Sequence, residues 1–192
     1  HGNPLLAAES MIRYHMARDE RTTITVTQRL GQSNSPLTVD ELIDAIKDPR
    51  FYVRFESVVS IARRDSDERL NEALVEMLHG RDPAMSVVAA WALGRIGDKH
   101  AVDALIEGLN SPYRSVRAHC ARSLGSLGEE SARSVLMELL AGEEDAGLRL
   151  AYASTLGHLG EAAAISPLLK MLAEREDQLE RDEISLALAR II

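Results

Sequence analysis

Histidine side chains are the residues in this sequence most able to bind a metal, and their spacing does not favour that role. Six are present: His1, His15, His79, His100, His119 and His158. No His-Glu-x-x-His motif occurs, so the helical spacing used by zinc hydrolases is missing. His119 and His158 fall in neighbouring segments of a repeat described below and could approach each other. We expect solvated surface histidines there and no metal site.

The serine, glycine and cysteine positions also favour structural roles. Ser123 and Ser126 flank glycine in SLGSLG, but a nucleophile elbow follows a strand, whereas a helical pattern precedes these serines. The glycines of 94–98 (GRIGD) and 125–128 (GSLG) lie at predicted helix ends rather than in a phosphate-binding loop. Cys120 occupies a repeating apolar position, which predicts a buried hydrophobic residue rather than a reactive thiol. We therefore predict a non-enzymatic protein without catalytic residues or cofactor.

Composition narrows the class of protein and its partners. The 192 residues are 45% hydrophobic and 27% charged, which is typical of a folded chain that is neither disordered nor membrane-spanning. The net charge of −8 argues against binding to nucleic acid phosphates and to anionic lipid. The single cysteine forms no internal disulfide, and no signal peptide is visible, so we predict a cytoplasmic location.

Apolar residues recur along most of the chain with a period of 31 or 32 residues. Three such series keep their phase relative to one another through five positions each, which indicates structural repeats. The series are Ile61, Leu93, Leu124, Leu156 and Leu188; Ile46, Leu78, Leu109, Leu140 and Leu172; and Leu42, Leu74, Leu105, Leu136 and Leu168. The predicted repeats are approximately 39–65, 66–98, 99–128, 129–160 and 161–192.

Each repeat shows two stretches of apolar residues at helical spacing, so we predict two amphipathic helices per repeat. A proline follows a capping residue between the two helices, where it fits the first helical position. These pairs are Asp48-Pro49, Asp82-Pro83 and Ser111-Pro112. Gly97, Gly128 and Gly160 are predicted to end second helices in the left-handed conformation. Thr38 and Glu41 have the spacing of a capping box that opens the first repeat.

The repeated segments resemble HEAT repeats of the short, bacterial, phycobilisome-lyase-like type. The resemblance is carried by SIARR (60–64), AWALGRIGD (90–98), ARSLGSLGE (121–129) and ASTLGHLGE (153–161), and it covers about four fifths of the chain. It implies an all-α fold, an α-α superhelix of about five two-helix repeats over 39–192. The fifth repeat departs from the pattern, because Glu180 replaces an apolar residue and no Gly closes its helix. Terminal repeats are commonly atypical.

The resemblance also assigns a recurrent arginine. One position of the repeat is occupied by arginine in four repeats, namely Arg54, Arg117, Arg149 and Arg181. In the second repeat this position is Ser86. In similar proteins this arginine binds carboxylates or helix-end carbonyls of the neighbouring repeat, so we expect a structural role. Hydroxylases with this repeat fold hold a di-iron centre through His-Glu pairs. No His is followed directly by Glu here, which argues against that activity.

A partner is expected on the concave surface, which second helices line in this type of fold. Counting 100° per residue from the buried series identifies the outward side of each second helix. The predicted partner-binding residues are Val59, Val88, Trp91, Arg95, His119, Arg122 and His158. The same count places Ala151 outward beside His158 in the fourth repeat. Trp and Arg are enriched at binding hot spots, so the only tryptophan is the centre of this prediction. The alternative is that Trp91 is covered by the N-terminal segment or a neighbouring helix.

Residues 1–38 precede the repeats and are predicted to form an N-terminal helical cap or linker. Residues 4–20 read as a helix, and 22–27 (TTITVT) as either a short extended piece or a strained helix start. Residues 31–36 have the composition of a linker. The segment is also similar to the start of HEAT modules that follow the core of some bacterial major-facilitator-type transporters. In that case the chain is a fragment whose missing upstream part tethers it to the cytoplasmic face of the inner membrane.

The sequence therefore predicts a non-enzymatic scaffold that binds a protein or peptide, with no nucleic-acid partner and no membrane insertion of this fragment. Two alternatives stay open: a cytoplasmic regulatory domain of a transporter, and a phycobilin-lyase-like protein that handles a chromophore. Neither the partner nor the oligomeric state is fixed by these residues.

Overall fold

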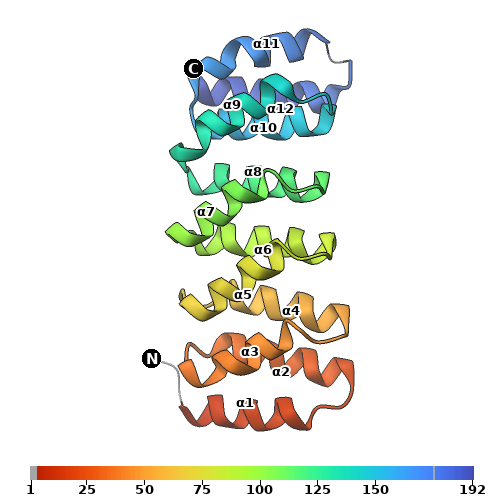
Figure 1. Ribbon diagram of the computed structural model, residues 1–192, viewed down its shortest axis with the longest axis vertical. Coiled ribbons are helices and arrows are strands. Elements are labelled where there is room, and N and C mark those ends of the chain that lie inside the picture. Colours follow the sequence, from red (N-terminus) through yellow and green to blue (C-terminus); the bar gives the residue numbers. More distant parts are fainter. Residues whose placement is uncertain (1–3, 175) are drawn as a thin grey trace. The chain divides into compact units, whose positions relative to one another are not determined.

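The computed structural model describes residues 4–174 and 176–192, and within them it contains helices and no strand (Figure 1). Residues 1–3 of the predicted cap lie outside the described residues. The chain divides into two compact units, residues 1–101 and 102–192. Within each unit helices pack in pairs, and the pairs stack on one another. The predicted all-α repeat fold is confirmed.

Unit 1 contains three stacked helical pairs. In Figure 1 they form the red to yellow-green part of the ribbon. The elements are α1 (Pro4–Met16), α2 (Glu20–Gln32), η1 (Pro36–Thr38), α3 (Val39–Ala45), α4 (Phe51–Ile61), α5 (Glu68–Leu78) and α6 (Pro83–Ile96). The second helices α2, α4 and α6 pack side by side in that order, so each has one side buried against its neighbours and one side left outward.

Unit 2 repeats the same arrangement. Its elements are α7 (Lys99–Gly108), within which the division between the units falls, α8 (Arg114–Leu127), η2 (Glu130–Ala132), α9 (Arg133–Gly142), α10 (Ala146–His158), η3 (Ala162–Ala164), α11 (Ile165–Glu174) and α12 (Gln178–Ile191). The second helices α8, α10 and α12 pack in that order. Backbones approach closely here: a Cβ added at Gly157 of α10 would lie 2.6 Å from the Ala187 Cβ of α12.

The three apolar series form the core, as predicted. Every member is buried except Leu172, which is half-buried in α11. The structure also extends the first series toward the N-terminus. Leu30 lies 31 residues before Ile61, is fully buried and belongs to α2, which packs on α4. The α1–α2 pair therefore stacks on the repeats as an additional helical pair, a relation that the polar and β-branched sequence of α2 conceals.

The predicted helix ends are confirmed at the glycines and only partly at the prolines. Gly97, Gly128 and Gly160 have φ of 66°, 69° and 65°, the left-handed conformation that costs little only for Gly. Asp82 caps α6, accepting hydrogen bonds from the Ala84 and Met85 amides, with Pro83 in the first turn.

The corresponding prediction is wrong for the other two prolines. The helix α4 begins at Phe51 after Arg50, and α8 begins at Arg114 after Tyr113, so Pro49 and Pro112 lie before the helices. Asp48 instead accepts a hydrogen bond from the Arg50 amide within the turn, which satisfies that donor outside the helix.

The predicted capping box at Thr38 is also wrong. The Thr38 hydroxyl donates to the Ser35 carbonyl at 2.9 Å and caps no amide of α3. Arg64 explains this arrangement, because its half-buried guanidinium donates to the carbonyls of Leu30, Ser33 and Ser35 and to the Thr38 hydroxyl. One arginine, three residues after α4, thus binds carbonyls in the last turn of α2 and in the segment that connects α2 to α3. Burial lowers the Arg64 pKa from its ordinary value.

Residues 22–27 are helical, so the extended alternative is wrong. The helix α1 ends at Met16 rather than at residue 20, and α2 runs through Gln32 into the predicted linker. Asp19 caps α2 by accepting a hydrogen bond from the Thr22 amide at 2.9 Å. Thr23 and Thr27 donate their hydroxyls to carbonyls four residues earlier. These local bonds satisfy the polar groups of β-branched residues inside a helix.

Candidate functional site

The outward side of the second helices, which we call the second-helix face, carries the predicted binding residues of unit 1. Trp91 of α6 is 40% exposed, so its ring is not covered by the N-terminal segment. Val59 of α4 and Val88 of α6 are half-buried, and Arg95 is exposed. The Arg95 guanidinium lies 5.9 Å from the centroid of the Trp91 ring, a cation–π contact that orients the indole.

Three exposed aromatic residues at the start of α4 were missed by the sequence analysis. The Tyr52 side chain is 64% exposed, and its ring lies 5.5 Å from that of Phe51. The Phe55 ring stacks on Phe51 with centroids 6.4 Å apart. Tyr52 precedes Val59 by seven residues, about two helical turns, and therefore shares its side of α4. The signal was present in the sequence, since FYVRF (51–55) holds three of the seven aromatic residues of the chain.

On α8 and α10 of unit 2 the exposed positions of this face are polar. His119 is half-buried and Arg122 exposed on α8, and His158 is exposed on α10. Each histidine places its Nδ1 against a carbonyl of its own helix, at 2.8 Å for His119 and 2.9 Å for His158. No group of His, Cys, Asp and Glu suited to a metal occurs among the described residues. Ala151, which the helical count placed outward beside His158, is buried, so that part of the count is wrong.

Val59, Val88, Trp91 and Arg95 come together on α4 and α6 of unit 1, whereas His119, Arg122 and His158 lie on α8 and α10 of unit 2. A single binding strip through all seven residues stays a prediction. The structure places the residues of α4 and α6 on two helices that pack side by side, so the aromatic and apolar surface of unit 1 is the candidate site.

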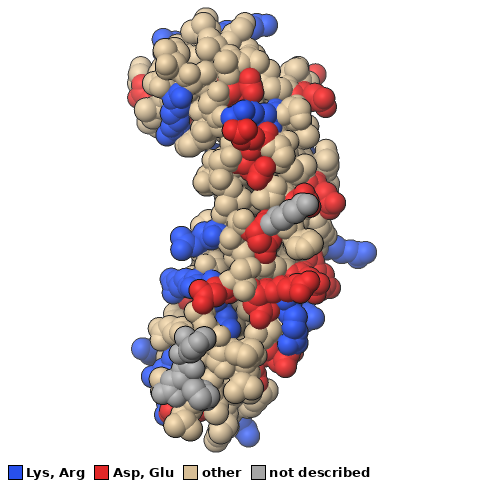
Figure 2. Space-filling model, turned by 90° about the vertical axis from the view of Figure 1, so that its left-hand side faces the viewer, with Lys and Arg blue, Asp and Glu red and all other residues tan. Residues whose placement is uncertain are grey.

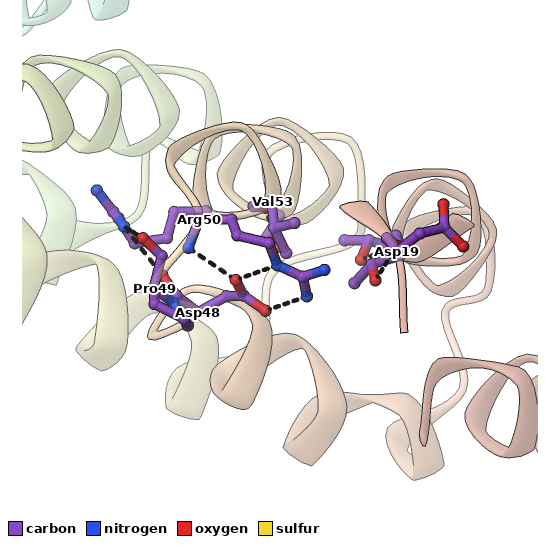
Figure 3. A network of polar contacts seen from close by, with 9 residues as sticks. Asp19, Asp48, Pro49, Arg50 and Val53 are labelled. Atoms are coloured by element: carbon purple, nitrogen blue, oxygen red, sulfur yellow. Dashed lines mark hydrogen bonds and ion pairs between the residues drawn. The ribbon is translucent and has the colours of Figure 1, made fainter. Parts of the chain in front are cut away.

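Each recurrent arginine is the fourth residue of its second helix. Arg54 donates to the carbonyls of Asp48 and Pro49 at 2.9 and 3.0 Å and pairs with Asp82 of the next repeat at 3.2 Å. Figure 3 shows the two-pronged pairing of Arg50 with Asp48 in the same turn.

The other repeats show related contacts. Arg117 donates to the Ser111 carbonyl at 3.0 Å, and Arg181 to the Leu172 carbonyl at 2.7 Å. Arg149 lies 3.9 Å from Glu174 in the next repeat. Where Ser86 replaces the arginine, its hydroxyl donates to the Met77 carbonyl at the end of α5. In four of the five repeats the position thus binds carbonyls in the last turn of the first helix or just after it, whichever polar residue occupies the position.

Charges of both signs are interspersed on the face drawn in Figure 2. This distribution does not resemble the continuous basic surface of a nucleic-acid-binding protein.

The hydrogen bonds from Arg50 hold the pKa of the Asp48 carboxyl below its ordinary value.

Cys120 is fully buried, and burial raises the pKa of its thiol to about 12. A thiol with such a pKa is almost entirely protonated near pH 7 and is a poor nucleophile. The predicted burial of Cys120 is confirmed.

Among the described helices, none has the length and apolar character needed to span a membrane.

Comparison with known proteins identifies the repeats. The model of the HEAT-repeat family matches residues 39–119, 71–149 and 102–189, which together cover most of the chain. No curated protein sequence matches significantly.

Solved structures resemble the chain at low sequence identity. YibA of Escherichia coli is 16% identical, with a TM-score of 0.61 over 98% of this chain and 67% of its own. Human deoxyhypusine hydroxylase is 22% identical, with a TM-score of 0.52 over 98% of this chain and 73% of its own. A designed armadillo repeat protein in complex with the peptide (KR)4 is 17% identical, with a TM-score of 0.52 over 98% and 99%. At these identities the similarity shows the fold alone.

Proposed function

Because the chain belongs to the HEAT-repeat family, we propose that it is a non-enzymatic scaffold that binds a protein or peptide on its second-helix face. The observation that carries the proposal is the exposed Trp91 ring, flanked by Val88 and oriented by Arg95. An exposed group of aromatic and apolar side chains usually marks an interaction surface. Stacked helices hold these side chains on a rigid frame, so little conformational entropy is lost on binding.

The chemistry of the face defines the kind of partner. Trp91, Tyr52 and the two valines offer flat apolar contact area, which fits apolar or aromatic side chains of a peptide. Arg95 and Arg63 lie exposed at the ends of α6 and α4 and supply charge for acidic groups at the rim. A partner segment with an apolar centre and acidic flanks therefore fits this surface. The similar fold of a designed armadillo protein in complex with a peptide is compatible with this mode of binding.

The finer expectations remain proposals. The resemblance supports a bacterial, phycobilisome-lyase-like repeat subtype and a cytoplasmic location, and it is the sole support for attachment to a transporter or for chromophore handling. The contacts of Arg54, Arg117, Arg149 and Arg181 support the proposed structural role of these arginines. Binding through His119, Arg122 and His158 is proposed as a weaker, polar extension in unit 2.

The test uses Trp91 as its own reporter, because it is the only tryptophan. Peptides selected from a random phage-displayed library on the 192-residue chain are titrated into it while tryptophan emission is recorded. The expected result is a saturable blue shift, since a bound peptide removes water from the indole. Leu37→Ala, at another exposed apolar residue of unit 1, is the control and should bind as tightly as wild type. Peptides that bind without any change in emission would place the site elsewhere.

A further inference from the structure

The first helical pair of unit 1 has an exposed apolar side that belongs to no site described above. Leu5, Ile12 and Met16 of α1 are exposed, Met16 by 73%. Beside them a pocket of about 420 Å³ opens between α1 and α2. Met16, Ala17 and Val26 supply its apolar wall. Covering an apolar face of this kind lowers the free energy of the system, because apolar surface is removed from water.

Arginines surround this pocket. Arg13, Arg21 and Arg29 line it, and no carboxylate does. Arg13 pairs with Glu9 at 2.6 Å on the exposed side of α1. Arg21 and Arg29 are exposed and form no ion pair within the part of the chain that the structure describes. In a protein of net charge −8, a pocket lined only by positive charges selects an acidic occupant.

The last helix of unit 2 has the complementary chemistry. Leu179 and Leu186 of α12 are 79% and 56% exposed. Asp182 and Glu183 lie between them along the helix and are exposed too. Asp182 accepts a hydrogen bond from the neutral Gln178, which leaves its charge uncompensated. The outward surface of α12 therefore alternates leucine, carboxylates and leucine at one-turn spacing.

We propose that α12 of one molecule docks on the α1–α2 pocket of a second molecule, so that copies associate head to tail. Leu179 and Leu186 cover the apolar wall, while Asp182 and Glu183 pair with Arg21 and Arg29. The contact is heterologous, because each copy uses a different surface on either side of it. Each added copy brings a free pocket and a free α12, so association continues past the dimer as concentration rises.

The mode of docking differs from the tight stacking inside each unit. There, the residue just before the buried series is small: Ser60, Thr155 and Ala187 meet Gly31, Gly125 and Gly157 of the preceding second helix. In α2 this position is Arg29, which is long and exposed. A second copy therefore cannot stack as closely as one more repeat, and the ion pairs carry much of the contact. Such a contact is reversible and sensitive to salt.

Sedimentation velocity over increasing concentrations of the 192-residue protein tests the proposal. We expect the average mass to rise with concentration at low salt and the association to weaken about tenfold in 1 M salt, where charges beyond a few ångström are screened. Arg21→Glu with Arg29→Glu should abolish association, and so should Asp182→Arg with Glu183→Arg. An equimolar mixture of these two double variants should restore it, since each pocket then meets an α12 of opposite charge.

The matched control for Asp182→Arg with Glu183→Arg is Glu72→Arg with Glu76→Arg, which makes the same change in net charge at exposed positions of α5. It should associate like wild type. A wild-type protein that stays monomeric at every concentration overturns the proposal. So does association that survives both reversals, or a mixture that stays monomeric. Trp91 is untouched in all these variants, so peptide binding to the second-helix face is measured separately and can fail or succeed independently.

Discussion

The second-helix faces of the two units differ although their backbones are built alike. In unit 1 the outward positions hold Tyr52, Val59 and Trp91, and in α8 of unit 2 the corresponding positions hold polar residues such as His119 and Arg122. The buried positions of the same helices remain apolar in both units. The packed side of each helix therefore keeps the apolar pattern of the repeat, while the outward side differs from repeat to repeat. Fold and binding chemistry are separate properties of the same helices.

The largest expected effect tests whether stacking is equivalent in the two units. Gly31→Leu and Gly157→Leu should each lower the free energy of unfolding by about 3 kcal/mol, because overpacking a close backbone contact is costly. The Cβ added at Gly31 would lie 2.9 Å from the Ser60 Cα, and that at Gly157 2.7 Å from the Ala187 Cα. Urea unfolding measures both.

Gly142→Ala is the control for these variants, since a Cβ there meets nothing within 4 Å. It should leave stability unchanged or raise it slightly, because Ala restricts the unfolded chain. A strong loss in one unit and none in the other would show that the two stacks are not equivalent.

The next effect concerns the difference between the faces. Trp91→Ala should weaken binding of a selected peptide by about 2 kcal/mol, roughly 30-fold, as expected of a hot-spot tryptophan. Arg122→Ala should cost less than about 1 kcal/mol, because exposed polar residues at an interface contribute little. Isothermal titration calorimetry gives both values. If Trp91→Ala instead lowered the thermal midpoint strongly and left affinity unchanged, Trp91 would belong to the core.

A smaller effect separates the turns that precede the second helices. Asp48 in unit 1 corresponds to Ser111 in unit 2, and only Asp48 can titrate. Its folded pKa is lowered by Arg50 below the unfolded value of about 3.9, so its stabilisation is present above that value and is lost as the pH falls through the folded pKa. Asp48→Asn should therefore cost about 1 kcal/mol at pH 7.

The difference between Asp48→Asn and wild type should shrink as the pH is lowered below about 4, because protonated Asp48 no longer attracts Arg50. Urea midpoints at pH 7 and pH 3 measure it. Asp44→Asn, at an exposed carboxylate of α3, serves as the comparison, because it removes a nearby carboxylate without touching the pairing of Asp48 with Arg50. Equal losses at both pH values would mean that the charge of Asp48 contributes nothing.

The smallest expected change is the reactivity of Cys120 in the folded protein. Burial raises the pKa of its thiol to about 12. A disulfide reagent at about pH 7.5 should therefore leave Cys120 unmodified in the folded protein. Labelling should appear only as unit 2 opens in urea, while Trp91 emission reports unit 1. Coincident transitions would show that both units unfold together, and labelling before the change in emission would show that unit 2 opens first.

The sequence by itself determined the repeat, its period and nearly all of its core, because apolar residues at fixed spacing must lie on one side of each helix. It also determined the glycine helix ends, since few residues other than Gly adopt positive φ at low cost. It did not reveal that α1 and α2 stack as a further pair. The threonines of α2 suggest extended backbone, whereas the segment is helical because its buried side, which includes Val26, Thr27 and Leu30, packs against α4.

Tertiary structure alone decided which side chains remain exposed. Helical phase placed both Trp91 and Ala151 outward, yet Trp91 is exposed and Ala151 is covered. The same holds for Arg64, whose four polar partners come from a connection more than twenty residues away. Spacing along a helix fixes the direction of a side chain, but its burial depends on neighbouring helices that no local pattern describes.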